Sequence, residues 1–191
     1  MANLITLDEY KISENIQSTK EDARINSLIS AVSQLVKTYC GNSFIDFYTI
    51  AKTETFTINW ETDIVQLTES PVNSIATVKE RTSFDGAYTT LDSTKDYYFD
   101  GVTDAVFRIN SDGSKKNFPR GPKSVEVSYR AGYQACPADL QLAVIDLITY
   151  YMKDEHKARQ TIAGASIQNQ GSTSQRNNVA FPDHIKRVLD L

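Results

Sequence analysis

Apolar residues recur at helical spacing in two stretches of the 191-residue chain. Between residues 25 and 39 they fall at i, i+3, i+4 and i+7, which predicts one amphipathic helix that ends near Gly41. A second helix is predicted after Pro137, where Leu142 and Ile145 widen the apolar stripe into a broad buried face. Neither helix can hide its own stripe, so the two are expected to pack together.

Two helix starts are indicated near the N-terminus, and the second of them precedes the first long helix. Thr6 is followed by Glu9, and Ser18 by Glu21, which is the spacing of the capping box. In that motif the hydroxyl and the carboxylate satisfy amide donors that have no partner inside the helix. We therefore expect one short helix before the first long one.

The segment between the two long helices has a different pattern. Near-alternating polarity and many β-branched and aromatic residues indicate strands, and Asn, Asp, Gly and Pro residues separate them as turns. This pattern predicts a small antiparallel β unit. The predicted strands cover residues 53–59, 64–67, 75–81, 97–99, 105–109 and 125–129.

The predicted fold class is α+β: a helical core of two long antiparallel helices with short terminal helices, and a small antiparallel β unit inserted between them. The expected boundaries are 1–43 for the N-terminal helices, 44–133 for the β unit, 134–158 for the second long helix and 159–191 for a flexible linker with a C-terminal docking helix.

The C-terminal part is divided by composition. Residues 168–175 are Gln, Asn, Ser, Thr and Gly, which offer little apolar surface for folding, so a linker is expected there. After Phe181, a short amphipathic helix is predicted in which Ile185, Val188 and Leu189 share one face.

Composition and charge narrow the class of protein. With 40% hydrophobic residues the chain can build a core, and a net charge of -4 disfavours general binding to nucleic acid. No apolar run of about eighteen residues and no N-terminal targeting pattern is visible, so no membrane association is expected. Cys40 and Cys136 match no paired motif, which fits a reducing cytoplasm where the protein is made.

Catalytic and metal-binding residue patterns are scarce. His156 and His184 each lie in a charged helical context, and neither has a close cysteine or histidine partner. We therefore expect no catalytic residue, metal or cofactor. A basic loop with Lys115, Lys116 and Arg120 also carries Phe118, so it is the one candidate for nucleic-acid contact, although the pattern favours an exposed β-turn.

The order of these parts resembles the head–tail connector (adaptor) family of tailed bacteriophages, the type that docks on the portal as a ring. The strings that carry the resemblance are, in chain order, residues 4–10, Tyr39-Cys40-Gly41-Asn42-Ser43-Phe44, residues 69–75, Phe84-Asp85-Gly86, residues 125–133 with Tyr129-Arg130-Ala131-Gly132-Tyr133, and Cys136-Pro137-Ala138-Asp139-Leu140.

The resemblance implies a structural protein at the head–tail interface of the virion. It implies a ring, commonly of about twelve copies, under the portal protein, with a stopper or tail-completion protein on its other side. Genomic DNA would pass through during packaging and ejection without sequence-specific binding.

Two sets of interface residues follow from this reading. Phe181, Ile185, Val188 and Leu189 are expected to bind a groove of the portal, or else to pack on their own subunit. Lys115, Lys116 and Arg120 are expected to face the stopper or the lumen.

Two other classes stay open. A tail-terminator or tail-completion ring would also be non-enzymatic but would contact the tail tube. A small enzyme or a β-rich binding module would instead gather titratable residues in a pocket.

Overall fold

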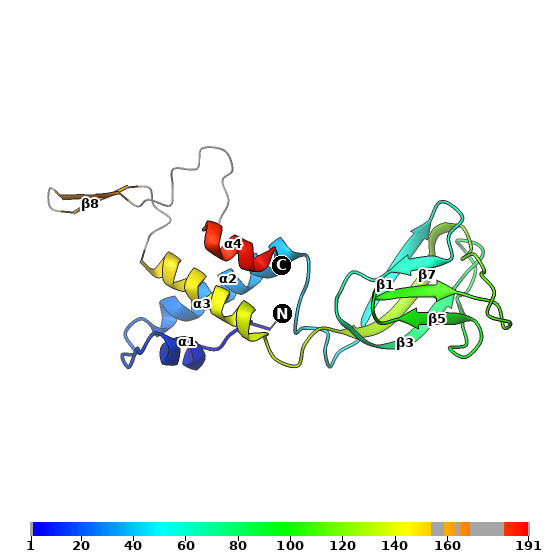
Figure 1. The fold of residues 1–191 in the computed structure, drawn as a ribbon, viewed down its shortest axis with the longest axis horizontal. Coiled ribbons are helices and arrows are strands. Elements are labelled where there is room, and N and C mark those ends of the chain that lie inside the picture. The colour runs from blue at the N-terminus through cyan, green and yellow to red at the C-terminus, as the bar shows by residue number, and fades with distance from the viewer. Residues whose placement is uncertain (1, 154–158, 163–164, 169–181, 191) are drawn as a thin grey trace. The chain divides into compact units, whose positions relative to one another are not determined.

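The computed structural model describes residues 2–153, 159–162, 165–168 and 182–190. The chain divides into two compact units. The helical unit is formed by Met1–Cys40 with Cys136–Leu191, and the β unit is formed by Gly41–Ala135. Helices and antiparallel sheets both occur, so the predicted α+β class is confirmed (Figure 1).

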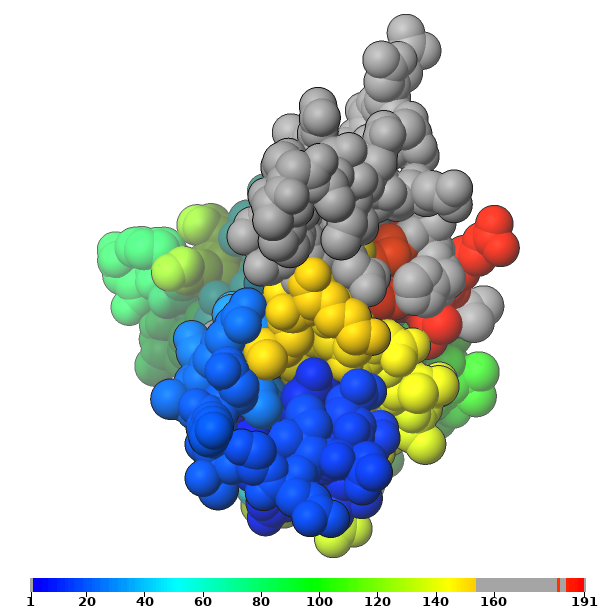
Figure 2. All heavy atoms as spheres, turned by 90° about the vertical axis from the view of Figure 1, so that its left-hand side faces the viewer, coloured from blue at the N-terminus to red at the C-terminus, as the bar shows by residue number. Residues whose placement is uncertain are grey.

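The described helices belong to the helical unit. They are α1 (Leu7–Ser13), α2 (Asp22–Cys40), α3 (Ala138–Met152) and α4 (Asp183–Leu189). Helix α2 contacts α1 and α3, and α3 contacts α4. Figure 2 shows α3, in yellow, directly against the N-terminal helices, in blue. The interior is apolar: Ile25, Ile29, Val32 and Val36 from α2 and Leu140, Val144, Leu147 and Ile148 from α3 are buried.

One face of α3 differs from the prediction. Ile145 is buried as expected, but Leu142 is 60% exposed. Leu142 lies one helical turn before the exposed Asp146, so the two share the outer stripe of the helix. The buried face of α3 is therefore narrower than the sequence suggested.

The N-terminal capping box is present as predicted. The Thr6 hydroxyl accepts from the Glu9 amide at 3.2 Å, and the Glu9 carboxylate accepts from the Thr6 amide at 2.6 Å. The second helix begins later than expected, at Asp22, because the Ser18 hydroxyl accepts from the Lys20 amide in a turn that precedes the helix.

The β unit contains two antiparallel sheets. The four-stranded sheet has the order β1-β7-β3-β4, and the three-stranded sheet has the order β2-β6-β5. The strands are β1 (Lys52–Ile58), β2 (Ile64–Gln66), β3 (Val72–Glu80), β4 (Thr89–Thr90), β5 (Tyr97–Asp100), β6 (Ala105–Arg108) and β7 (Gly121–Ala131).

The six predicted strands are all present, and three additional strands were not predicted. These are β4 and a hairpin, β8 (Arg159–Ile162) paired antiparallel with β9 (Ala165–Gln168). The hairpin falls within the range assigned to a linker. Residues 169–181, where the polar composition is strongest, lie outside the described residues.

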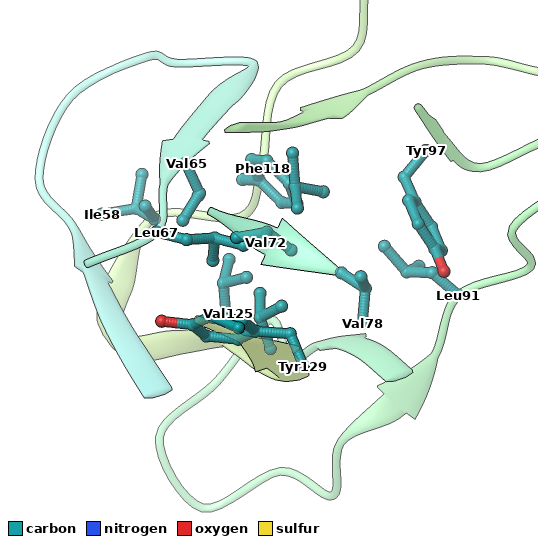
Figure 3. Packing of buried hydrophobic residues seen from close by; sticks show 13 residues of the cluster. Ile58, Val65, Leu67, Val72, Val78, Leu91, Tyr97, Phe118, Val125 and Tyr129 are labelled. Atoms are coloured by element: carbon teal, nitrogen blue, oxygen red, sulfur yellow. The ribbon is translucent and has the colours of Figure 1, made fainter. Parts of the chain in front are cut away.

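The two sheets enclose one apolar core (Figure 3). Val65 and Val106 reach it from the three-stranded sheet, and Val78, Val127 and Tyr129 reach it from the four-stranded sheet. One buried ion pair also joins the sheets.

That ion pair is formed by Arg108 on β6 and Glu80 on β3. The guanidinium donates twice to the carboxylate, with both N–O distances 3.0 Å. A bidentate bond of this kind fixes geometry as well as charge, so it sets the position of one sheet against the other.

The chain enters and leaves the β unit along two segments that are bonded together. The Tyr133 amide donates to the Phe44 carbonyl at 2.7 Å, and the Ala131 amide donates to the Phe47 carbonyl at 3.1 Å. Gly132 has φ +92, and a Cβ there would stand 2.0 Å from the Phe44 oxygen. Only glycine fits this close approach, which explains why the turn after β7 carries it.

A buried acid holds the entering segment in place. The Glu69 carboxylate accepts from the Ser43 amide at 2.8 Å, from the Ser43 hydroxyl at 2.9 Å and from the Lys52 ammonium at 2.9 Å. The Tyr129 hydroxyl in turn accepts from the Glu69 amide at 3.2 Å. The entry to the β unit is thus bonded to its central strand, β7.

The same lysine also pairs with Glu54 at 2.6 Å. Burial alone would lower the pKa of Lys52, but its bonds to Glu54 and Glu69 outweigh burial and raise it. Burial would likewise raise the pKa of Glu54, yet the bonds from Lys52 and Thr68 hold it below its ordinary range. The pair is therefore ionised at neutral pH.

We expect Leu147→Ala to lower the free energy of unfolding of the helical unit by about 2–5 kcal/mol, because it leaves a cavity in the core. The matched control is Leu142→Ala on the exposed side of the same helix, with an expected change within about 0.5 kcal/mol. Urea unfolding followed by far-ultraviolet circular dichroism measures both. Equal losses would contradict the described orientation of α3.

We expect Gly132→Ala to destabilise the β unit by about 3 kcal/mol or more, because a left-handed backbone and a clash with the Phe44 carbonyl add together. Gly113→Ala is the matched control, since Gly113 has φ +82 but no atom within 4 Å of a built Cβ. That change should cost about 1 kcal/mol. Denaturant unfolding of the two variants compares them, and similar costs would refute the close approach.

Candidate interaction surfaces

Helix α4 lies on its own unit in this structure. Ile185, one of four residues predicted to bind the portal, is 1% exposed, and α4 contacts α3. Val188 is 38% exposed and Leu189 is half-buried. Phe181, the fourth predicted residue, lies outside the described residues. Helix α4 thus buries one apolar side chain in its own unit and presents another to solvent.

Two groups at the end of α2 donate hydrogen bonds to the end of α4. The Tyr39 hydroxyl donates to the Asp190 carboxylate at 2.5 Å, and this bond is the main cause that raises the pKa of Tyr39 to about 12. The Cys40 thiol lies 3.9 Å from the Leu189 carbonyl and donates a weak bond to it. Burial, assisted by the Asp190 charge, raises the pKa of Cys40. Both donors are therefore protonated at neutral pH.

The predicted basic loop lies beside the chain that leads into β2. Lys115 pairs with Asp63 at 3.3 Å, and Arg120 pairs with Glu61 at 2.9 Å. Lys116 is exposed and has no ion-pair partner within the described ranges. Two of the three predicted cations are thus neutralised by neighbouring acids, which weakens the attraction of this loop for phosphate.

The aromatic residue of that loop does not reach solvent. Phe118 is buried in the core of the β unit, and its amide donates to the Thr62 carbonyl at 2.9 Å. Base stacking needs an exposed ring. The loop therefore lacks the aromatic contact that made nucleic-acid binding a candidate, and Phe118 instead fixes the loop on the sheet.

The titratable cluster of Lys52, Glu54 and Glu69 is occupied by its own ion pairs. No three His, Cys, Asp or Glu residues in the part of the chain that the structure describes could hold a metal ion. Both cysteines are free, and burial raises the pKa of Cys136 to about 11. A shallow cavity of about 360 Å³ is lined by Tyr48, Thr49, Asn73, Ser74 and Arg130. Among the described helices, none is long and apolar enough to cross a bilayer.

Several exposed apolar side chains were missed by the sequence analysis, and two features of the β unit stand out among them. One is the row of Ile64, Phe107 and Tyr98 across the three-stranded sheet, and the other is Phe84 at the turn between β3 and β4. The turn itself was predicted from Asp85-Gly86, but exposure of the ring was not. The row depends on the pairing of distant strands, for which the sequence carries no local signal.

Comparison with solved structures shows a shared fold. A chain in the virion of a native gene transfer agent (GTA) particle matches with a TM-score of 0.58 at 16% identity, over 98% of this chain and 88% of that chain. A chain in the neck of an empty GTA particle matches with a TM-score of 0.56 at 18% identity, over 85% and 82% of the two chains.

Comparison of sequences identifies a relative and a family. The head completion protein of Escherichia phage T5 is 27% identical over 88 residues, which are 44% of this chain and 48% of the T5 protein. This chain therefore spans about half the length of the curated relative that it matches. The resemblance to phage head–tail connectors is confirmed at the level of the family. The family model described as HCP, head completion protein, matches residues 3–191, so the chain belongs to the head completion protein family.

Proposed function

We propose that this protein is a head–tail connector (adaptor) subunit located at the head–tail interface of a tailed-phage virion. The observation that carries the proposal is the family match, which extends over residues 3–191. The shared fold with a chain from a particle neck supports it. The role is structural: the protein joins the capsid to the stopper and tail and catalyses no reaction.

The proposed assembly is a ring of about twelve copies under the portal. DNA passes through its centre during packaging and ejection. A net charge of -4 suits this role, because an acidic chain offers few cations to bind the phosphate backbone. The ring thus guides DNA without retaining it.

The proposal gives the two units separate tasks. The helical unit, with α2 and α3 antiparallel at its core, is the base of each subunit. The β unit, about residues 44–133, is an insertion that carries contact surfaces, and residues 159–191 serve as linker and docking segment. The two compact units support this division, and the packing of α3 on both α2 and α4 supports the helical unit as the base.

We assign the portal contact to the exposed side of α4, with Val188 at its centre. Val188 is accessible while α4 stays on its unit, whereas Ile185 is not. Ile185, Leu189 and Phe181 join the contact when α4 leaves α3 and inserts into a portal groove. A helix of seven residues is too short to be stable alone, so α4 has to pack either on α3 or in the portal groove.

We assign the loop with Lys115, Lys116 and Arg120 to the stopper. Its ion pairs with Asp63 and Glu61 leave little net charge for DNA. Paired charges at the rim of a protein interface favour orientation and specificity, which a stopper contact requires.

The experiment that tests the function is co-sedimentation of the purified protein with assembled portal rings and, separately, with tail tubes, followed by negative-stain imaging. A ring on the portal supports the connector. Binding to tail tubes without binding to the portal would assign the protein to tail termination instead.

We expect Val188→Glu to weaken portal binding at least about ten-fold, which corresponds to about 1.4 kcal/mol. Leu142→Glu, at an exposed leucine of α3, is the matched control and should bind as the wild type does. Removal of residues 171–191 should abolish attachment and leave the β unit folded. Since the deletion also uncovers the surface under Ile185, the point variant is the decisive one, and unchanged affinity would exclude α4 from the contact.

We expect the Tyr39 phenol of the free protein to titrate at about 12 and to move toward its ordinary range in Asp190→Asn, which removes the accepting carboxylate. Because the folded-state pKa is raised, the bond contributes stability below pH about 10 and loses it as pH rises to about 12. NMR of ¹³C-labelled tyrosine measures this, with Tyr10 as an unaffected internal control. Ordinary titration of Tyr39 in the wild type would show that α4 is not docked on its own subunit.

A further inference from the structure

The two sheets of the β unit have different outer faces. On the four-stranded sheet the outward residues are polar and bonded to each other: the Thr53 hydroxyl lies 3.3 Å from that of Ser128, and Lys79 pairs with Glu126 at 2.8 Å. An antiparallel sheet commonly has one such solvated face. The three-stranded sheet does not follow this pattern.

Its outer face carries one apolar row from edge to edge. Ile64 on β2 pairs with Phe107 on β6, and Phe107 pairs with Tyr98 on β5. Ile64 is 40% and Tyr98 57% exposed, and the rings of Tyr98 and Phe107 are 6.2 Å apart. Their neighbours Val65 and Val106 point to the core, so this row adds nothing to the interior. We refer to these three residues as the apolar row.

The second feature is a rigid aromatic tip. Phe84 is 61% exposed, and the Arg81 guanidinium stacks 4.9 Å from its ring and 4.8 Å from the ring of Tyr88. Arg81 also donates to the carbonyls of Lys123 at 3.0 Å, Phe84 at 2.6 Å and Pro122 at 3.3 Å. We call Arg81, Phe84 and Tyr88 the aromatic tip.

The fixed conformation of the tip lowers the entropy that it would lose on binding. An exposed aromatic side chain held in one conformation loses little entropy when it binds, which is the property of an interface anchor. The bonds of Arg81 fix the turn, and although its guanidinium stacks on the Phe84 ring, that side chain stays 61% exposed. The tip is therefore arranged to insert its ring into an apolar surface.

We infer that the aromatic tip of one subunit packs on the apolar row of the next subunit in the ring. The inference rests on the proposed function. A ring requires each copy to present two different surfaces that fit each other, because the contact is head to tail. The tip and the row are distinct, both are apolar and aromatic, and both belong to the β unit. Aromatic rings in contact also prefer the tilted and offset arrangements that such packing allows.

The charges around the two surfaces are complementary. The Lys123 carbonyl accepts hydrogen bonds from the Arg81 guanidinium and the Tyr88 hydroxyl, so the exposed Lys123 cation lies beside the tip. Asp85 is the one acid in that turn. Asp100 lies two residues after Tyr98 on the same side of β5. Asp100 beside the row can pair with Lys123 beside the tip of a neighbouring copy, whereas tip-to-tip pairing would bring like charges together.

Disulfide trapping between two copies tests this contact. In a Cys40→Ser, Cys136→Ser background, a chain with Phe84→Cys is mixed with a mass-tagged chain with Tyr98→Cys and oxidised. The matched control pairs Phe84→Cys with Thr53→Cys, which lies on the polar face. We expect about ten-fold more mixed dimer from the Tyr98→Cys pair than from this control, which corresponds to a difference of about 1.4 kcal/mol in binding free energy. A chain with both Phe84→Cys and Tyr98→Cys should form a ladder of linked subunits that ends at the ring.

Light scattering of the wild-type protein, with and without portal rings, separates the two ways in which the inference can fail. Assembly without the mixed disulfide, or with Phe84→Cys homodimers dominant, overturns the tip-to-row contact and leaves the ring. No assembly under either condition overturns the ring and the contact together.

Discussion

Tyr133 donates its amide hydrogen to the Phe44 carbonyl, and this bond joins the chain that enters the β unit to the chain that leaves it. The approach is so close that residue 132 has to be glycine. Glu69 also holds the entering segment, because its carboxylate accepts hydrogen bonds from Ser43 and Lys52. A sheet can be inserted between two helices only when its ends meet, because the helices would otherwise be pulled apart. The rest of the architecture depends on this closure.

The apolar side chains of this protein fall into two groups: those that form the interiors of the two units and those that remain at the surface. Both units have a closed apolar interior, and the β unit adds the inter-sheet pair of Arg108 with Glu80. Apolar side chains nevertheless remain outside, at the apolar row, the aromatic tip and Val188. Single exposed apolar side chains are common on any protein, whereas a contiguous apolar row is typical of a surface that another protein covers. Membership of the head completion protein family agrees with that reading.

Sequence periodicity predicted the long helices and six strands, because core-facing residues repeat along each element. It misplaced Leu142, since an apolar residue on the outer stripe of a helix cannot be told from a core residue by type. It also began the last long strand too late, at residue 125: β7 begins at Gly121 and includes Pro122, which lacks an amide donor and was interpreted as part of a turn.

The candidate surfaces were harder to predict than the elements. The basic loop was located, but its ion pairs with Asp63 and Glu61 and the burial of Phe118 depend on tertiary contacts. The C-terminal helix was predicted with its apolar face, yet sequence left open which protein covers it. The row formed by Ile64, Phe107 and Tyr98 depends on the pairing of β2 with β6, strands that lie far apart in the sequence. Such a row is visible only once strand register is known.

The closure at Phe44 and Tyr133 also bears on how such proteins diverge. Backbone bonds from Tyr133 to Phe44 and from Ala131 to Phe47, beside Gly132, set the spacing between the two segments that connect the β unit to the helices. Hairpins can therefore lengthen, or new strands be added, without any compensating change in the helical unit. A lineage could in this way rebuild the surface that meets a new neighbour in the particle while it keeps the same base.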